Sequence, residues 1–323
     1  MSPFPAHLLS MEDLDREAIG EVLRVADSFV EVGQRSIPKV PALRGRTVAT
    51  LFFEDSTRTR MSFETAAKRM SADVLSFAAG SSAIKKGESL RDTVETIEAI
   101  GIDAVVIRHR SSGVPARVAG WLRRGAVVNA GDGWHQHPTQ ALADLYTVRE
   151  SRGGGDRGLE RMAGLRVVIV GDVRHSRVAR SQVAGYAAVG AEVTLVAPPT
   201  LLPPSLEGWP VAGVSHHLDE VLPKADVVSL LRVQSERGSG AFVPSLREYT
   251  AGFGLTARRV TLLDPEAVIL HPGPMVRGVE IASDVAELPA ARITEQVSNG
   301  VAVRMAVLFL LLGQGAGEAA LRA

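Results

Sequence analysis

Short apolar runs alternate with segments of helical periodicity along the whole chain, and this alternation restricts the possible folds more than any other feature. Strands and helices that alternate in this way are typical of parallel sheets with helices on both faces. The expected strands are Thr47–Phe53, Ala104–Ile107, Ala126–Asn129, Leu165–Val170, Glu192–Val196, Asp226–Leu231 and Ala267–Leu270. We therefore predict an α/β protein built from doubly wound parallel sheets.

The middle of the chain contains a glycine-rich polar segment, Ser151–Gly158, which divides the expected strands into two groups. The length of 323 residues is enough for two domains at roughly 150 residues each. We therefore expect the domain boundary in this segment. Near the far end, apolar residues from Val301 to Leu312 follow a helical spacing, and Gly313 is placed to end that helix.

Composition excludes several classes of function. Lysine and arginine together number 36, as do aspartate and glutamate, so no net field draws the chain to nucleic acid or to an anionic membrane. The absence of cysteine excludes a disulfide framework, a thiolate nucleophile and a cysteine-ligated zinc ion. The amino terminus lacks a basic stretch before an apolar run, and Met305–Leu312 is too short to span a membrane, so we expect a cytoplasmic protein.

The first expected strand runs directly into a helix whose first turn is basic. A first turn normally favours acidic residues because its free N–H groups and the helix dipole are positive, yet this one carries Arg58 and Arg60. The pattern is typical of a bound anion, with the hydroxyls of Ser56, Thr57 and Thr59 as further donors. The alternative is an ordinary serine cap followed by solvated arginines.

Two other strand ends carry polar residues of a related kind. Arg108 follows the second expected strand, and His137 and Gln140 follow the third, at the start of a helix. Because ligands bind beyond the carboxyl ends of parallel strands, we expect Arg58, Arg108 and His137 to surround one pocket. Guanidinium groups suit phosphate oxygens, whereas a neutral imidazole and an amide suit a carbonyl and an amino group. A metal site at His135 and His137 is the rival interpretation, but no third ligand accompanies the pair.

The second half of the chain places arginines after strands again. The strand that ends at Gly171-Asp172 invites a dinucleotide-binding interpretation, but the following residues lack the required glycine spacing. Arg177 follows that strand, and Arg232-Val-Gln234 follows the strand at Asp226–Leu231. Two separate guanidinium groups suit a small dicarboxylate, while the alternative for each is an ordinary surface arginine.

Seven short segments occur in order over essentially the whole chain: Ser56–Arg60, Ser82–Ser89, Arg108-His109, His137–Gln140, Gly171–Arg177, Arg232–Gln234 and His271–Pro274. Together they resemble the catalytic chains of the aspartate carbamoyltransferase family. The resemblance implies transfer of a carbamoyl group from carbamoyl phosphate to the α-amino group of L-aspartate, the committed step of pyrimidine synthesis, without a metal or nucleotide cofactor.

The resemblance also implies roles for individual residues. The phosphate would be held by Ser56, Thr57, Arg58 and Thr59, and the carbamoyl end by Arg108, His137 and Gln140. Around the carbonyl oxygen, Arg108, His137 and the Thr59 hydroxyl would stabilise the charge that develops. Aspartate would be held by Lys86, Arg177, Arg232 and Gln234, and the site would also be lined by Ser82, Gly273 and Pro274.

At the level of domains, the resemblance implies a carbamoyl phosphate-binding domain formed by 1–150 and 293–323 and an aspartate-binding domain formed by 151–292. The last helix would pack back on the first domain. The family further implies a homotrimer in which Ser82 and Lys86 are lent to the neighbouring subunit's site. Such a trimer stands alone or in a larger assembly with regulatory or dihydroorotase chains.

Alternatives within and outside the family stay open. Ornithine carbamoyltransferase shares several motifs but lacks the paired lysines and carries a cysteine motif, whereas this chain has Lys85-Lys86 and no cysteine. The segment after His271-Pro272, Gly273–Glu280, resembles that of other bacterial members. Because Lys85 and Lys86 add two cations, a dicarboxylate acceptor fits better than a cationic one. The remaining alternatives are a nucleotide-dependent oxidoreductase on the same fold and an exported two-domain protein that binds small anions.

Overall fold

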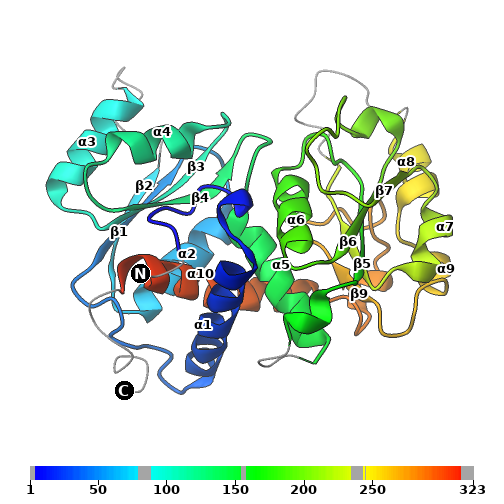
Figure 1. Ribbon diagram of the computed structural model, residues 1–323, viewed down its shortest axis with the longest axis horizontal. Coiled ribbons are helices and arrows are strands. Elements are labelled where there is room, and N and C mark those ends of the chain that lie inside the picture. Colours follow the sequence, from blue (N-terminus) through cyan, green and yellow to red (C-terminus); the bar gives the residue numbers. More distant parts are fainter. Residues whose placement is uncertain (1–3, 79–88, 154–157, 234–242, 244, 314–323) are drawn as a thin grey trace. The chain divides into compact units, whose positions relative to one another are not determined.

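The computed structural model describes residues 4–78, 89–153, 158–233, 243 and 245–313 (Figure 1). The chain forms two compact units, the first of Met1–Ala143 with Val297–Ala323 and the second of Asp144–Gln296. The division falls inside two helices, α5 (Pro138–Ser151) and α10 (Ile293–Leu312). The domain bounds expected from the sequence stay a prediction.

The first unit is built on a four-stranded parallel sheet with the order β2-β1-β3-β4. Its strands are β1 (Thr47–Phe52), β2 (Asp73–Ala78), β3 (Ala104–His109) and β4 (Ala126–Asp132). Its other helices are α1 (Arg16–Gln34), α2 (Thr57–Arg69), α3 (Leu90–Ile100) and α4 (Val114–Trp121). In Figure 1, α3 and α4 cover one face of the sheet and α1, α2 and α10 lie on the other, so both faces are buried.

Helix α10 packs back on the first unit, as expected from the sequence. Phe309 meets Phe29 of α1 edge to face, with ring centroids 5.9 Å apart. The buried Arg304 donates a hydrogen bond to Ser62 Oγ at 2.9 Å and lies over the ring of Phe63, both in α2. By length and composition α10 could cross a membrane, but most of its apolar stretch is buried inside the protein, as in a core helix.

The second unit has a five-stranded parallel sheet with the order β7-β6-β5-β8-β9. Its strands are β5 (Arg166–Val170), β6 (Glu192–Val196), β7 (Gly213–Ser215), β8 (Val227–Leu230) and β9 (Val268–Leu270). Its helices are α6 (Arg177–Ala188), α7 (Leu218–Val221), α8 (Leu246–Phe253) and α9 (Ala257–Val260). The predicted fold class, two parallel sheets flanked by helices, is confirmed.

Short 3-10 helices complete the described secondary structure at Met11–Asp13, Glu160–Met162, Pro199–Leu201, Leu222–Lys224 and Val285–Glu287. A capping box at Ser10 stabilises the start of the first of them: the Ser10 hydroxyl accepts from Glu12 N and the Asp13 carboxylate accepts from Ser10 N.

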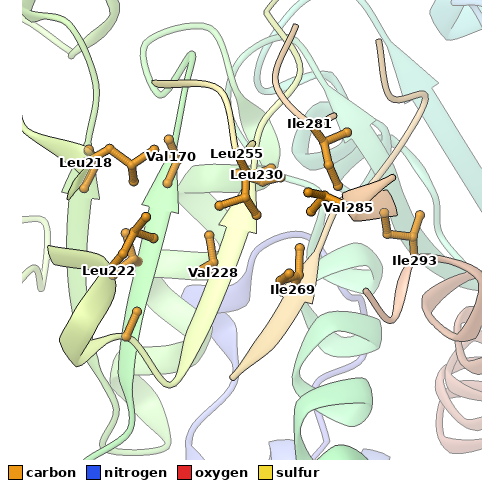
Figure 2. Packing of buried hydrophobic residues seen from close by; sticks show 13 residues of the cluster. Val170, Leu218, Leu222, Val228, Leu230, Leu255, Ile269, Ile281, Val285 and Ile293 are labelled. Carbon is orange, nitrogen blue, oxygen red and sulfur yellow. The ribbon is translucent and has the colours of Figure 1, made fainter. Parts of the chain in front are cut away.

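One face of the second sheet carries a continuous apolar core (Figure 2). In the parallel register Val168 lies opposite Val228, and Val228 lies opposite Ile269, so one row of branched side chains crosses three strands. Alternate residues face the other side, where Ser229 Oγ accepts a hydrogen bond from Gln182 of α6 at 2.8 Å. Burial on both faces explains why these strands are continuous apolar runs in the sequence.

Two strands that lie at sheet edges, β2 and β7, were not predicted from the sequence. Strand β2 mixes polar and apolar residues, with Leu75 42% exposed, and β7 is only three residues long. Edge position alone is not the reason, because the edge strands β4 and β9 are fully buried apolar runs and were predicted. Strands β2 and β7 were missed because they are only partly buried, so their sequences lack the apolar run that identifies a buried strand.

Ile269→Ala is expected to lower the free energy of unfolding by about 2–5 kcal/mol, because it leaves a cavity in the fully buried row of the second unit. Urea unfolding, monitored by circular dichroism, measures this change in the free energy of unfolding. Leu246→Ala, at a position that is 46% exposed, is the matched control and should stay within about 0.5 kcal/mol of the parent. Equal effects of the two substitutions would contradict this assignment of the core.

Candidate active site

Three neighbouring strands of the first unit end at one edge of its sheet and carry the polar residues expected there. Strands β1, β3 and β4 are adjacent and parallel, so their carboxyl ends lie side by side. Ser56 follows β1, Arg108 is the fifth residue of β3 and pairs with Phe52 of β1, and His137 directly precedes α5. The structure thus places the three chain segments that carry Arg58, Arg108 and His137 at one edge of the sheet, while a shared pocket stays a prediction.

The start of α2 lacks the features of an ordinary capped helix. Within the described part of the chain, the Ser56 side chain makes no capping hydrogen bond, and the first turn contains no acidic residue. In contrast, Asp15, Ser89 and Ser245 each cap their helix and are followed by an acidic residue in the first turn. The capping role that the alternative gives Ser56 is therefore wrong, although Arg58 and Arg60 are both exposed, as that alternative expects. The positive end of α2 stays open to an external anion.

The side chains around this helix end are held at different depths. Thr59 is buried, and its Oγ1 lies 3.5 Å from Nε2 of the buried His137. Arg108 is 13% exposed; its Nη1 donates to Ala130 O at 3.2 Å and its Nε lies 3.4 Å from a Glu54 carboxylate oxygen. Arg58, at the second position of α2, is exposed. The side chains of Thr59, Arg108 and His137 are thus buried or largely buried, whereas the Arg58 guanidinium is exposed at the same helix end.

Thr57 and Gln140 complete the residues that the sequence places at this edge. Thr57 is the exposed first residue of α2, and Gln140 lies half-buried in the first turn of α5. The Gln140 backbone N–H donates to the carbonyl of His137 at 3.0 Å, which fixes His137 at the entry of the helix.

The connection from β4 to α5 is organised by Asp132, which the sequence analysis did not single out. Its Oδ1 accepts from Asn129 Nδ2 at 2.8 Å and from Gln136 N at 3.0 Å. Its Oδ2 accepts from Gly113 N and lies 3.1 Å from Nδ1 of His135. Asp132 therefore holds the loop that presents His137, and His135 pairs with this carboxylate. The signal in the sequence was the short polar segment between strand and helix.

Burial alone would raise the pKa of Asp132, but the hydrogen bonds from His135, Asn129 and Gly113 outweigh it and the pKa is lowered. A lowered pKa means that the ionised form stabilises the fold above the unfolded-state pKa. That contribution is lost as the pH falls through the lower, folded-state pKa.

Asp132→Asn is expected to lower the free energy of unfolding by about 1–3 kcal/mol at neutral pH, because an amide cannot accept every one of these hydrogen bonds. The deficit should begin to shrink below about pH 4, where the carboxylate of the unfolded chain is protonated, and should keep shrinking until the folded carboxylate is protonated at a lower pH. Urea unfolding of the variant and the parent between about pH 7 and about pH 3 measures this difference in free energy of unfolding, and Asp73→Asn, at an exposed position, is the control. A deficit that does not change with pH would contradict the role of the charge.

The second unit repeats the arrangement at strands β5, β8 and β9, which are also adjacent and parallel. Arg177 begins α6 after β5 and is buried, Arg232 follows β8 and is half-buried, and Gly273-Pro274 follow β9. A Cβ built on Gly171, whose φ is +124°, would lie 2.9 Å from the carbonyl of Leu231. The ends of β5 and β8 therefore meet closely enough to require glycine.

The turn before Arg177 is fixed by a buried acid and histidine. Asp172 Oδ1 accepts from the backbone N–H of His175 at 3.2 Å and lies 2.8 Å from its Nδ1. Ser176 caps α6 by accepting from Ala179 N at 3.1 Å. Helix α6, like α2, has a basic residue and no acidic residue in its first turn. The arginine is thus presented on a rigid turn at a positive helix end.

Three of the expected residues, Ser82, Lys86 and Gln234, lie outside the described residues. A cavity of about 510 Å³ in the second unit lies away from the strand ends that carry Arg177 and Arg232. It is lined by Arg152, Glu266, Arg292 and the start of β9, and it contains no residue of the expected site. We place the candidate site at the carboxyl ends of the strands, because the charged groups converge there.

Comparison with known proteins decides between the families that could share this arrangement. The model of the aspartate/ornithine carbamoyltransferase carbamoyl-P binding domain matches residues 6–150, and that of the Asp/Orn binding domain matches residues 163–311. The chain belongs to the aspartate/ornithine carbamoyltransferase family. The strand ends with Arg58, Arg108 and His137 fall in the first carbamoyltransferase domain, and those with Arg177 and Arg232 fall in the second.

Individual carbamoyltransferases resemble the chain over nearly its whole length. The aspartate carbamoyltransferase catalytic subunit of Acidothermus cellulolyticus is 59% identical over 318 residues, which cover 97% of this chain and 96% of that protein. The catalytic subunit from Thermobifida fusca is 58% identical over 307 residues, 95% of either chain.

Solved carbamoyltransferase structures agree with the fold. Aspartate transcarbamoylase from Trypanosoma cruzi in complex with N-(phosphonacetyl)-L-aspartic acid has a TM-score of 0.84 at 30% identity, over 95% of each chain. The catalytic subunit of the M. jannaschii enzyme has a TM-score of 0.82 at 33% identity, over 97% of this chain and 100% of that one.

Proposed function

We propose that this chain transfers the carbamoyl group of carbamoyl phosphate to L-aspartate, giving N-carbamoyl-L-aspartate and phosphate in pyrimidine biosynthesis. The observation that carries the proposal is the placement of arginines at two neighbouring strand ends in each of two separate sheets, with His137 at a third strand end of the first sheet. The relatives are aspartate carbamoyltransferase catalytic subunits, and a similar structure was solved with carbamoyl phosphate and aspartate.

Carbamoyl phosphate is assigned to the first domain, 1–150 with 293–323. Its dianionic phosphate fits the uncapped start of α2, where the hydroxyls of Ser56 and Thr57 and the guanidinium of Arg58 are at hand. Backbone N–H groups at a helix start and a guanidinium fork both favour phosphate oxygens.

The carbamoyl end of this substrate is assigned to the deeper groups. As the amine attacks, the carbonyl oxygen gains negative charge, and the Arg108 guanidinium, the His137 ring and the Thr59 hydroxyl are donors positioned to stabilise it. Gln140, beside His137, suits the amino group through its side-chain oxygen. The departing phosphate can take the proton from the amine, so the chain need not supply a general base.

Aspartate is assigned to the second domain, 151–292, with Arg177 and Arg232 each taking one carboxylate. Lys86 and Gln234 are proposed as further ligands, and Ser82 and the backbone of Gly273 and Pro274 as lining groups. Two guanidinium groups repel a cationic side chain, so they favour aspartate over ornithine as the acceptor.

Arg177→Ala and Arg232→Ala are expected to raise the KM for aspartate by about tenfold or more and to leave the affinity for carbamoyl phosphate unchanged, because each removes a fork to one carboxylate. The rate of phosphate release, measured while the concentration of aspartate or of carbamoyl phosphate is varied, gives the KM for aspartate and the affinity for carbamoyl phosphate. The exposed Arg24→Ala on α1 is the control. An unchanged KM in both site variants would contradict the assignment.

The same assay tests the reaction itself. The parent should release phosphate and form N-carbamoyl-L-aspartate with L-aspartate and show negligible turnover with ornithine. Efficient carbamoylation of ornithine would assign the chain to the ornithine branch, and absence of turnover with either amino acid would overturn the proposed function.

We further propose a cytoplasmic homotrimer, alone or joined by regulatory or dihydroorotase chains. Strand β2 is an edge strand, and an unpaired edge is a site where another chain can dock. Leu75, in β2, is 42% exposed and Met61, in α2, is 57% exposed, which leaves apolar side chains for a second copy to cover. In such a trimer Ser82 and Lys86 are proposed to enter the neighbour's site.

Arg58→Ala and Lys86→Ala trimers should each be nearly inactive, since the first lacks the resident half of every site and the second the lent half. When the two proteins are dissociated and reassembled together, some interfaces join an intact loop to an intact pocket. Activity should then return to the fraction set by random assortment. Inactive mixtures that a mass tag shows to be hybrid would remove Ser82 and Lys86 from the site.

A further inference from the structure

The turn after β9 is bracketed by a buried histidine and a buried glutamate. His271 and Glu280 are each 1% exposed, and His271 Nε2 lies 3.1 Å from Glu280 Oε1. Between them lie Gly273 and Pro274, the residues expected to line the site. Neither His271 nor Glu280 has a role in the proposed reaction. Their contacts with the backbone of the turn therefore have to explain why they are buried.

Each of the two side chains holds one backbone amide of the turn. The N–H of Gly273 donates to His271 Nδ1 at 2.9 Å, and the N–H of Val276 donates to Glu280 Oε1 at 2.8 Å. Because Nδ1 accepts a hydrogen bond, the imidazole proton lies on Nε2 and is donated to Glu280. The pair therefore holds the backbone on both sides of Pro274 and Met275.

Both ends of the turn are tied to rigid parts of the second unit. Leu255 N donates to the carbonyl of Glu280 at 3.0 Å, and Leu255 and Ile281 belong to the apolar core (Figure 2). At the other end, the N–H of His271 donates to Gln296 Oε1 at 2.8 Å, and Gln296 Nε2 donates to Asp144 at 2.8 Å. Hydrogen bonds thus hold both ends of the turn in the second unit, and the His271 and Glu280 side chains fix the backbone between them.

This pair is poorly suited to stabilising the fold alone. Both hydrogen bonds to Glu280 fall on Oε1, and within the described residues its buried Oε2 has no hydrogen-bond partner. A buried carboxylate with an unsatisfied oxygen is costly, and an apolar side chain of similar volume is often as stable or more so. The accepting oxygen of Glu280 is therefore better explained by the conformation that its two hydrogen bonds impose on the turn.

We propose that Glu280, acting through His271, is a positioning residue for the aspartate half of the site. It holds the Gly273-Pro274 backbone beside the strand ends that carry Arg177 and Arg232. This inference rests on the proposed function, because the turn matters only where aspartate binds beside it. Glu280 touches no substrate in this account, so its loss acts on the orientation of the acceptor and spares the phosphate pocket of the other domain.

Glu280→Met and Glu280→Gln form the test, with kinetics of aspartate carbamoylation and a separate measurement of carbamoyl phosphate affinity. Methionine fills a similar volume but accepts neither hydrogen bond, so Glu280→Met should raise the KM for aspartate about tenfold and leave carbamoyl phosphate affinity within about twofold. Glutamine keeps an oxygen for both donors, so Glu280→Gln should stay within about threefold of the parent.

Three results would overturn the inference: an unchanged aspartate KM in folded Glu280→Met, an equal loss in Glu280→Gln, or an equal loss of carbamoyl phosphate affinity. If Glu280→Met does not fold, His271→Asn takes its place, because asparagine can accept from Gly273 N but does not reach Glu280. It should show the same selective rise in KM, and an unchanged KM would overturn the inference. A parent with no activity toward aspartate would instead overturn the proposed function.

Discussion

Parallel pairing of the strands is the constraint on which the rest of the structure depends. In a parallel sheet all carboxyl ends lie at one edge, so residues far apart in sequence become neighbours there. In the first unit this brings Ser56, Arg108 and His137 together from strands β1, β3 and β4. In the second it brings Arg177, Arg232 and the turn after β9 together in the same way. One geometric rule thus builds both halves of the proposed chemistry.

Helix dipoles add positive potential at these sheet edges. Helices α2 and α6 begin at those edges with arginines and without acidic residues, whereas α1, α3 and α8 begin with acidic residues that balance their positive ends. An uncompensated positive helix end beside an arginine is unfavourable in an isolated fold and becomes favourable when an anion binds. In the proposed function these two helix ends bind phosphate and a carboxylate, which would compensate the local cost of the uncompensated charge.

The sequence was sufficient for the central strands and for the arginines, because each signal is local. A strand buried on both faces is an apolar run, and the residue that follows it lies at the site edge by topology alone. Edge strands β2 and β7 lack such a run and were missed. Asp132 and Glu280 were missed for another reason, since each acts through hydrogen bonds to backbone amides of a folded loop, a pattern that no spacing in the chain reveals.

A crystal structure with phosphate and succinate bound tests the central claim most directly. The account predicts phosphate at the start of α2, within hydrogen-bond distance of Arg58 and the Ser56 hydroxyl. It also predicts succinate with its carboxylates on Arg177 and Arg232, beside the turn that Glu280 holds. Anions bound away from the carboxyl ends of the strands, with these arginines left in solvent, would contradict it.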